Sequence, residues 1–267
     1  MSVQTLYTAA TGMEALQTKL EIIANNMANI NTVGFKRDRA NFEDLFYVQD
    51  KLPGAQDSAG NYTPNGLSVG LGSRVSGVQT DYTQGGFQTT NRQLDLAIEG
   101  IGFFQVRDQT GEIMFSRAGN FGINSNGQLV VGSAQTGRLV EPPINIPPDT
   151  MNISVSAEGI VEVQQANNTQ LSQVGQLQLA QFINNNGLMK VGENLYRQTI
   201  SSGNATLNNP GTNGLGNIRQ GNLESSNVEP VGELIDLITT QRAFELNSQT
   251  IQAGDQIMQL VANLRRF

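Results

Sequence analysis

The distribution of proline and glycine constrains the fold of this chain more than any other feature. All eight prolines lie between Pro53 and Pro230, and 25 of the 29 glycines lie between Gly54 and Gly221. Because these residue types interrupt helices, the first fifty and the last forty residues are nearly free of helix breakers. The sequence therefore predicts helical ends around a central region of strands and turns.

The amino-terminal segment has the clearest periodicity. Apolar residues recur there at steps of three and four for more than three heptads, which is the spacing of one helix face. They are Leu6, Ala9, Met13, Leu16, Leu20, Ile23, Met27 and Ile30. Glu14 and Lys19 lie off this face, and we expect Gly34 to end the helix in a left-handed cap. The apolar face is predicted to pack against another helix.

The carboxy-terminal segment repeats this design. Asn227 is a candidate N-cap, and Pro230 suits the first turn, where an N–H has no helical acceptor. One apolar stripe consists of Ala243, Leu246, Thr250, Ala253, Ile257, Leu260, Leu264 and Phe267, and a second, offset by one residue, of Phe244, Ile251 and Met258. Two stripes can contact two neighbours at once, which favours a coiled coil. Packing of both helices on the central domain is an equally open interpretation.

The central region has the pattern of an antiparallel β domain. Residues 94–99 follow the period of a half-buried strand, and turn sequences at 108–111 and 124–127 separate further apolar runs. Strands are predicted at 94–99, 103–107, 113–117, 121–124, 128–131, 153–157, 160–163 and 176–182. Local hairpins in series indicate a meander or a small barrel. Segments 50–70 and 201–217 are expected to be long loops or extended connections.

Together these patterns predict an α+β fold. Long amino- and carboxy-terminal helices form a coiled coil, and a central antiparallel β domain separates them in the sequence. The expected parts are an amino-terminal helix and cap at 1–45, an extended connecting and bracing segment at 46–90, the β domain at 91–190, a Gly/Asn-rich return segment at 191–226, and the carboxy-terminal coiled-coil helix at 227–267.

Composition excludes several classes of function. The chain has no His and no Cys, so it cannot build a Ser-His-Asp triad, a cysteine nucleophile, a thiolate or imidazole zinc site, or a disulfide. Sixteen Lys and Arg against 23 Asp and Glu give a net charge of −7, which argues against nucleic acid as a partner. No apolar run approaches the roughly 20 residues of a membrane span, and the start lacks the features of a cleaved signal peptide.

The remaining candidate chemistry is weak. Gly100 and Gly102 supply two glycines of a dinucleotide-binding fingerprint, but no βαβ unit surrounds them. Asp38, Glu43 and Asp44 could pair for acid–base work. They lie beside Lys36, Arg37 and Arg39, so surface ion pairing is the favoured interpretation. We predict no enzyme activity, no catalytic residue, no metal site and no cofactor.

Three motifs resemble those of the bacterial flagellar rod and hook family of axial proteins. The first is Ala24–Lys36, which reads ANNMANINTVGFK, and the second is Leu94–Phe104, which reads LDLAIEGIGFF. The third is Ser225–Val228, which reads SSNV, followed by QRAFELN at Gln241–Asn247. The motifs occur in the family's order and are spread over nearly the whole chain.

The resemblance implies a structural subunit of a helical, tubular driveshaft that transmits torque from the flagellar motor to the hook. Such subunits cross the periplasm as part of the basal-body rod, and the flagellar type III apparatus exports them without a cleaved signal peptide. The implied partners are further copies of the chain, proximal rod subunits, hook subunits, the surrounding basal-body rings and the export apparatus. A membrane-spanning role and nucleic-acid binding are not implied.

Within the family, the chain length and the stretch Phe42–Tyr47 favour the distal-rod branch. A hook or proximal-rod subunit is the alternative inside the family. The alternative from another class is a secreted carbohydrate-binding β protein, suggested by a composition that includes 26 Gln and 28 Asn.

Two groups of residues are the candidate sites. The polymer interface is predicted at Leu6, Met13, Leu16, Leu20, Ile23, Met27, Ile30, Phe244, Leu246, Ile251, Ile257, Met258, Leu260 and Leu264. The bracing segment contains Phe42, Leu45, Phe46, Tyr47, Leu52 and Tyr62. A disordered linker rarely carries so many large apolar groups, so we expect this segment to lie ordered against adjacent subunits.

Overall fold

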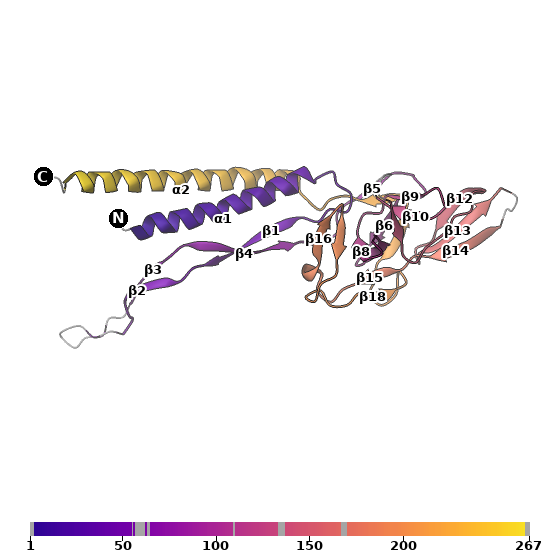
Figure 1. Ribbon diagram of the computed structural model, residues 1–267, viewed down its shortest axis with the longest axis horizontal. Helices are drawn as coiled ribbons and strands as arrows, with labels where there is room; N and C mark the ends of the chain where they lie inside the picture. The colour runs from indigo at the N-terminus through magenta and orange to yellow at the C-terminus, as the bar shows by residue number, and fades with distance from the viewer. Residues whose placement is uncertain are drawn as a thin grey trace. The chain divides into compact units, whose positions relative to one another are not determined.

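The computed structural model of the chain describes residues 3–54, 56, 62, 65–108, 110–132, 137–166 and 170–264. The chain divides into two compact units (Figure 1). Unit 1 consists of Met1–Ala28, Asp38–Thr80 and Glu229–Phe267, and unit 2 consists of Asn29–Arg37 and Asp81–Val228. Each unit is therefore assembled from segments that are far apart in the sequence.

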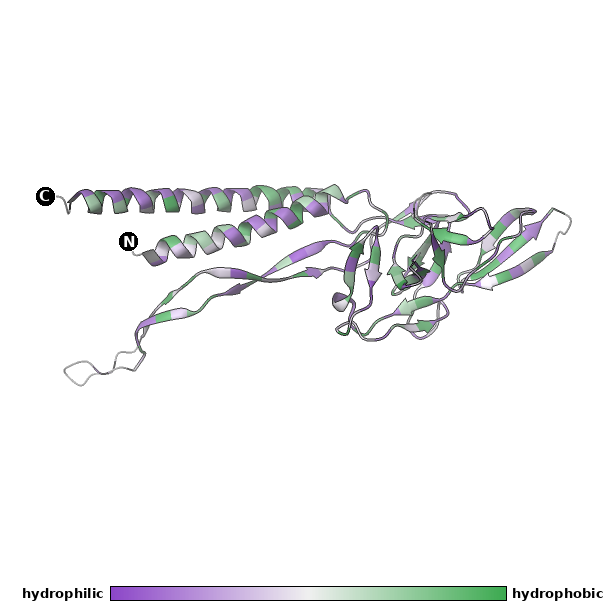
Figure 2. Cartoon of the chain, in the orientation of Figure 1, coloured by the Kyte–Doolittle hydropathy of each residue, from purple (hydrophilic) through white to green (hydrophobic). Residues whose placement is uncertain are grey.

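Unit 1 contains two long helices, as the scarcity of helix breakers predicts. Helix α1 spans Val3–Ala28 and helix α2 spans Pro230–Leu264. Hydrophobic residues, green in Figure 2, recur along the whole of α2. Helix α1 ends at Ala28, so Ile30 and Gly34 lie beyond it. No helix in the described part of the chain is long and apolar enough to cross a membrane.

The two helices pack against each other in antiparallel register. Three successive contacts pair Leu6 with Gly254, Gly12 with Asn247, and Asn26 with Glu233. A Cβ atom on Gly254 would lie 2.5 Å from Leu6 Cδ2, so the missing side chain makes room for the leucine. Near the other end of α1, buried Asn26 donates from Nδ2 to Glu233 Oε2 at 3.4 Å. Small residues and one buried polar contact therefore set the register.

The remainder of unit 1 is a two-stranded arm. Strand β1 (Asp38–Asp44) pairs antiparallel with β4 (Ser73–Thr80), and β2 (Tyr47–Lys51) pairs with β3 (Leu67–Gly70). Two backbone hydrogen bonds join the pairs into one ribbon: Leu45 N donates to Gly72 O, and Leu71 N donates to Phe46 O. These strands occupy part of the range expected to be a connecting segment.

The arm lies beside α1 within unit 1. A Cβ atom on Gly72, whose φ is +114°, would lie 2.0 Å from Thr11 Oγ1. The amide of Asn26 also contacts the start of the arm, because Nδ2 donates to Asp38 O at 2.9 Å and Oδ1 accepts from Asp38 N at 3.0 Å. These contacts explain why the ribbon belongs to the unit that contains the helices.

Unit 2 is built mainly from one antiparallel sheet. Within the described ranges this sheet has nine strands, with the order β16-β17-β8-β7-β11-β10-β9 and with β15 pairing both β7 and β18. The strands are β7 (Phe103–Arg107), β8 (Ile113–Ser116), β9 (Phe121–Ile123), β10 (Leu129–Val131), β11 (Arg138–Val140), β15 (Leu179–Gln181), β16 (Met189–Gly192), β17 (Leu195–Arg197) and β18 (Thr206–Asn208). A short 3-10 helix, η1, spans Asn185–Gly187.

Smaller sheets complete the unit. A three-stranded sheet contains β12 (Thr150–Val155), β13 (Ile160–Gln165) and β14 (Leu171–Gln176), and two further pairs join β6 (Leu96–Glu99) to β19 (Asn217–Gln220) and β5 (Phe87–Thr89) to β20 (Asn222–Glu224). Phe104, Ile98 and Leu179 are completely buried at the centre of the main hydrophobic core. The prediction of a mostly β central region is confirmed.

The alternation of apolar and polar residues predicted the positions of most strands in the central region, but it did not predict where each strand begins and ends. Strand β7 coincides with the predicted range 103–107, whereas β15 is shorter than the predicted range 176–182. Strand β14, which begins at Leu171, was not predicted because its residues alternate weakly. The segment 201–217, expected to be a loop or extended connection, contains β18 and the first residue of β19.

Candidate functional site

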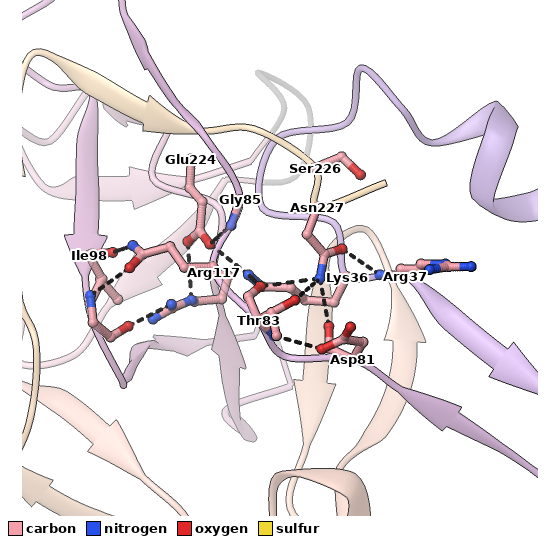
Figure 3. A network of polar contacts seen from close by, with 12 residues as sticks. Lys36, Arg37, Asp81, Thr83, Gly85, Ile98, Arg117, Glu224, Ser226 and Asn227 are labelled. Carbon is pink, nitrogen blue, oxygen red and sulfur yellow. Dashed lines mark hydrogen bonds and ion pairs between the residues drawn. The ribbon is translucent and has the colours of Figure 1, made fainter. Parts of the chain in front are cut away.

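Three charged side chains lie buried together in unit 2 (Figure 3). Lys36 Nζ lies 2.6 Å from Glu224 Oε1, and Arg117 Nε lies 3.2 Å from Glu224 Oε2. The side chains are 0%, 1% and 5% exposed for Lys36, Glu224 and Arg117. We name these three residues the charged junction. They come from three segments separated by more than eighty residues of sequence each, so the junction ties distant parts of the chain together.

Hydrogen bonds to the backbone complete the junction. Lys36 Nζ also donates to Thr83 O at 2.7 Å, and Gly85 N donates to Glu224 Oε1 at 3.1 Å. Arg117 donates to two carbonyl oxygens of the second family-like motif, Gly102 O at 2.6 Å and Gly100 O at 2.7 Å. Burial of charge is costly unless partners of this kind compensate for lost water.

Burial dominates the protonation of the two cations. Loss of water lowers the pKa of Lys36, and the attraction of Glu224 opposes that shift without cancelling it. Loss of water likewise lowers the pKa of Arg117, again against the attraction of Glu224. Their functional groups are engaged within the chain, so the junction has the chemistry of a structural clamp.

Hydrogen bonds in the same region join three segments at which the chain enters or leaves unit 2. Gly34 N donates to Glu224 O at 2.8 Å, and Arg37 N donates to Asn227 Oδ1 at 2.8 Å. Asn227 Nδ2 donates in turn to Asp81 O at 2.8 Å. The first and third family-like motifs are therefore held side by side by hydrogen bonds.

Three expectations for this region are wrong. Gly34 does not cap α1: it has a φ of +69°, and a Cβ atom there would lie 2.7 Å from the Arg117 backbone carbon, so glycine is needed for close approach. Asn227 does not cap α2, which begins at Pro230. Lys36 is not a surface residue, although Glu43 does form the expected kind of exposed ion pair, with Arg74 at 3.1 Å.

The predicted interface residues of α1 and α2 fall into two groups. Ile23 is buried, and Leu6, Met13, Leu16, Leu20, Met27, Ile30, Phe244, Ile251 and Ile257 are half-buried. Leu246, Met258 and Leu260 are exposed by 64%, 42% and 63%. The side chain of Leu264 lies outside the described residues. Residues of both stripes, Phe244 and Ile251 from one and Ile257 from the other, are thus partly covered, whereas Leu246 and Leu260 are left uncovered in the single chain.

Helix α2 carries a line of exposed large apolar side chains that extends this uncovered group. We name it the α2 stripe, and it consists of Val231, Ile235, Ile238, Leu246 and Leu260, each more than half exposed. At about 100° per residue these positions lie opposite Glu233, Thr240 and Gly254, which are buried. Val231, Ile235 and Ile238 were not among the predicted interface residues, because Arg242 interrupts the apolar spacing between them and Leu246.

The predicted bracing residues are mostly exposed on the arm of unit 1. Phe46 and Tyr62 are 87% and 69% exposed, and Phe42, Tyr47 and Leu52 are 43–60% exposed. Leu45 is half-buried. Such a group of uncovered large apolar side chains is typical of surfaces that contact other molecules. In the described part of the chain no group of three or more acidic residues is placed to hold a metal ion.

Comparisons with protein families agree with the three motifs. Residues 6–36 match the family model described as "Flagella basal body rod protein", and residues 97–163 match "Flagellar hook protein FlgE/F/G D1 domain". Residues 219–264 match "Flagellar basal body rod FlgEFG protein C-terminal". Lys36, Gly34 and Glu224 of the charged junction region all lie inside the first and last of these matches.

Full-length relatives are also similar. The chain is 45% identical to "Flagellar basal-body rod protein FlgG" of Caulobacter vibrioides, over 98% of this chain and 99% of the relative. Proteins with the same description are 43% identical in Buchnera aphidicola subsp. Baizongia pistaciae, over 97% of this chain and 98% of the relative, and 38% identical in Bacillus subtilis, over 98% and 99%.

Proposed function

Because this chain belongs to the flagellar basal-body rod protein family, we propose that it is a self-assembling subunit of the distal rod, a helical tube that transmits torque from the motor to the hook. The family role is structural. The finer assignment to the distal rod rests on full-length similarity to rod proteins described as FlgG, which favours it over the hook and proximal-rod alternatives.

The α2 stripe is the single observation that most strongly supports assembly. Its five large side chains are each more than half exposed, yet each would contribute about 1.5–3 kcal/mol if it were buried against a neighbour. One side of α2 already packs on α1 of the same chain, so the opposite side is free for a second contact. We propose that stripes of neighbouring copies bury each other, so that the terminal helices form coiled-coil contacts in the polymer.

The charged junction supports the mechanical part of the proposal. Pulling one member out of a buried ion cluster leaves the others buried without a partner, which costs several kcal/mol, so the junction resists separation of the segments that it joins. A subunit that transmits torque needs the chain segments leading to its polymer contacts to be held firmly. Lys36 and Glu224, which lie close to the starts of the arm and of α2 in the sequence, meet that need.

The further partners follow from the same proposal. The rod would contact proximal rod subunits at one end, hook subunits at the other, and the basal-body rings around it. The subunit would reach its place through the flagellar type III apparatus, without a cleaved signal peptide, and the rod would cross the periplasm. Neither nucleic acid nor a cofactor has a role in this function, and the exposed bracing residues of the arm would lie against adjacent subunits.

Assembly can be tested by placing charge on the α2 stripe. In the Ile238→Asp/Leu246→Asp variant, carboxylates would have to be buried at the contact, so filaments should fail to form at concentrations that support wild-type assembly. The matched control is Gln241→Asp, an exposed position of α2 outside the stripe, which should assemble normally. Electron microscopy and sedimentation measure the polymer. Normal filaments from the double variant, with unchanged circular dichroism, would contradict the proposal.

A further inference from the structure

Two isoleucines project from the surface of unit 2. Ile183 and Ile200 have relative exposures of 94% and 104%, the highest of any large apolar side chain in the described ranges. They lie on adjacent loops, because Asn184 Nδ2 donates to Ser201 O at 3.1 Å and Asn184 N donates to Ser202 O at 3.4 Å. We name this pair the isoleucine knob.

The loops that carry the knob are held in place by hydroxyl groups. Thr199 Oγ1 donates to Gly187 O at 2.5 Å, and Ser202 Oγ donates to Thr199 O at 2.8 Å. Ser202 is completely buried, and Leu188, which follows η1, is buried in the aromatic core of the unit. The knob is therefore preorganised, which reduces the entropy lost when it binds a partner.

The same unit contains a cleft of about 580 Å³. Its apolar lining comes from Leu94, Ile123, Ile146, Pro147, Met151 and Ile153, and none of the described residues that line it is charged. The turn between β9 and β10 forms one wall, and Ile146 N donates to Gly127 O at 2.7 Å to fix that wall. The start of β12 supplies another wall. The cleft is therefore an uncharged hollow whose walls combine apolar side chains with the polar side chains of Gln93, Asn124 and Thr150, among others.

Neither the knob nor the cleft carries a charged side chain, and the two lie in different parts of unit 2. The segments 183–188 and 198–204, which form the knob loops, contain no charged residue, so neither surface has to strip water from a charge on contact. Figure 1 shows β16, which follows the Ile183 loop, and β12, which borders the cleft, on opposite sides of unit 2. The knob cannot fill its own cleft, but it can reach the cleft of another copy.

We propose that the isoleucine knob of one copy inserts into the cleft of the next copy in the polymer. The two surfaces are different, so the contact is heterologous, and a heterologous contact that does not close into a ring repeats without end. It is therefore suited to a filament. This contact uses unit 2 and is distinct from the α2 stripe of unit 1, but it rests on the proposed function, because it presupposes that the chain assembles with itself.

Disulfide cross-linking tests the contact directly, because the natural chain has no cysteine. Three full-length double variants combine Ile200→Cys with Ile123→Cys, Met151→Cys or Ile153→Cys, and each is assembled before mild oxidation. We expect at least one pair to give a ladder of trimers and longer covalent oligomers on a non-reducing gel. Mixed single variants should stop at dimers. The control pairs Ile200→Cys with Leu171→Cys, which is 54% exposed on β14 and lies outside the cleft.

A second measurement does not depend on disulfide geometry. Ile183→Asp/Ile200→Asp should raise the concentration needed for assembly by roughly tenfold or more, because the contact would then have to bury two carboxylates in place of two apolar side chains. Leu171→Asp should leave that concentration unchanged. Polymers that form without any cleft-specific ladder, or an unchanged assembly concentration of the double aspartate variant, would overturn the inference alone. Failure of the wild-type chain to assemble would overturn the proposed function and this contact with it.

Discussion

Glu224 is the residue on which the buried charges of unit 2 converge. Its carboxylate faces Lys36 at 2.6 Å and Arg117 at 3.2 Å, and it also accepts the N–H of Gly85. Two cations share one anion in this arrangement. If the anion is removed, both cations are left buried without a charged partner. The geometry therefore makes Glu224, rather than either cation, the most sensitive position of the charged junction.

Replacing Glu224 by glutamine should destabilise unit 2 by about 3–5 kcal/mol, because a neutral amide leaves two buried cations uncompensated. The matched control is Glu112→Gln, which removes the partner of Arg197 in a pair that is 39% and 44% exposed, and it should cost less than about 1 kcal/mol. Urea unfolding followed by near-ultraviolet circular dichroism gives both values. Equal effects of the two substitutions would show that the junction is not a stabilising clamp.

Lys36 should make the stability of unit 2 depend on pH in the alkaline range. Burial lowers the pKa of Lys36 below its ordinary value of 10.5, so between the lowered value and 10.5 the unfolded chain binds more protons than the folded chain. The contribution of Lys36 to stability therefore rises with pH in that interval, by at most about 1.4 kcal/mol per pH unit.

The check for this dependence is Lys36→Met, measured beside the wild type by urea unfolding at several pH values below 10.5. Every other titratable group is common to both proteins, so the difference between the two unfolding free energies isolates Lys36. The wild type should gain stability relative to the variant as pH rises. A constant difference, or a relative loss, would contradict the lowered pKa.

The residues of the charged junction show the limit of sequence reasoning at this scale. Lys36 stands among Arg37, Asp38 and Arg39, which is the pattern of a solvated surface, and its partner lies 188 positions away. Gly34 followed an apolar run and was assigned to a helix cap, whereas its actual constraint is the backbone of Arg117. A local sequence pattern contains information about residues that are adjacent in the chain. The burial of Lys36 and the need for glycine at position 34 depend instead on residues that are close only in the folded structure.

At the scale of elements, the helix pair depends on glycine as well as on apolar residues. Gly254 faces Leu6 so closely that an added Cβ atom would lie 2.5 Å from Leu6 Cδ2, whereas a Cβ atom on Gly232 would lie 3.6 Å from Glu229 Oε2, which is ordinary contact. Both glycines lie in α2, Gly232 in its first turn and Gly254 in its interior, so alanine is the better helix former at both positions. They form a natural matched pair.

Gly232→Ala should stabilise α2 by about 0.5–1 kcal/mol, because alanine is the better helix former. Gly254→Ala gains the same propensity but crowds Leu6, so it should be less stable than Gly232→Ala by about 1 kcal/mol or more. Thermal unfolding of the full chain at 222 nm, the wavelength of the helical signal, compares the two. If the alanine variants are equally stable, Gly254 does not set the distance between the helices.

The sequence predicted that both ends of the chain are helical. It did not predict which side of each helix packs within the chain and which side stays exposed. Steps of three and four identified the apolar residues, but Leu246 and Phe244 could each have faced α1. In the structure Phe244 is half-buried and Leu246 is exposed. The side of α2 that packs on α1 includes the small or polar residues Asn247 and Gly254. A hydrophobic pattern therefore indicates where a helix lies, but it does not indicate which of its apolar residues contact which neighbour.

At the scale of the whole molecule, composition predicted helical ends and a β-rich middle, but it did not indicate which segments pack together. The sequence places residues 38–45 with the amino-terminal helix and residues 46–80 in the connecting and bracing segment, whereas in the structure Asp38–Thr80 belongs as one segment to unit 1. The reason lies in contacts such as Asn26 with Asp38 and Thr11 with Gly72, which join the arm to α1. Membership of a unit is decided by packing across long sequence distances.

The arm also gives the proposal on rod stiffness a sharp test. We expect its exposed residues, Phe46 and Tyr47 among them, to brace adjacent subunits. Replacing residues 47–70 by Asn-Gly removes β2 and β3 but lets the ribbon close where Leu71 N already donates to Phe46 O, because Asn-Gly favours a tight hairpin turn. The α2 stripe remains, so polymers should still assemble, but they should be curved or easily bent, as measured by electron microscopy.

The control for this replacement is a shorter deletion of residues 54–64, bridged by the same turn, which retains β2 and β3 with their exposed apolar side chains. Its polymers should stay as straight as those of the wild type, since the bracing side chains on the strands remain in place. If both variants form straight polymers, the resistance to bending comes from the helices or from unit 2, and the proposal for the arm is wrong. Curved polymers from both would assign the stiffness to the deleted segment 54–64, which contains Tyr62.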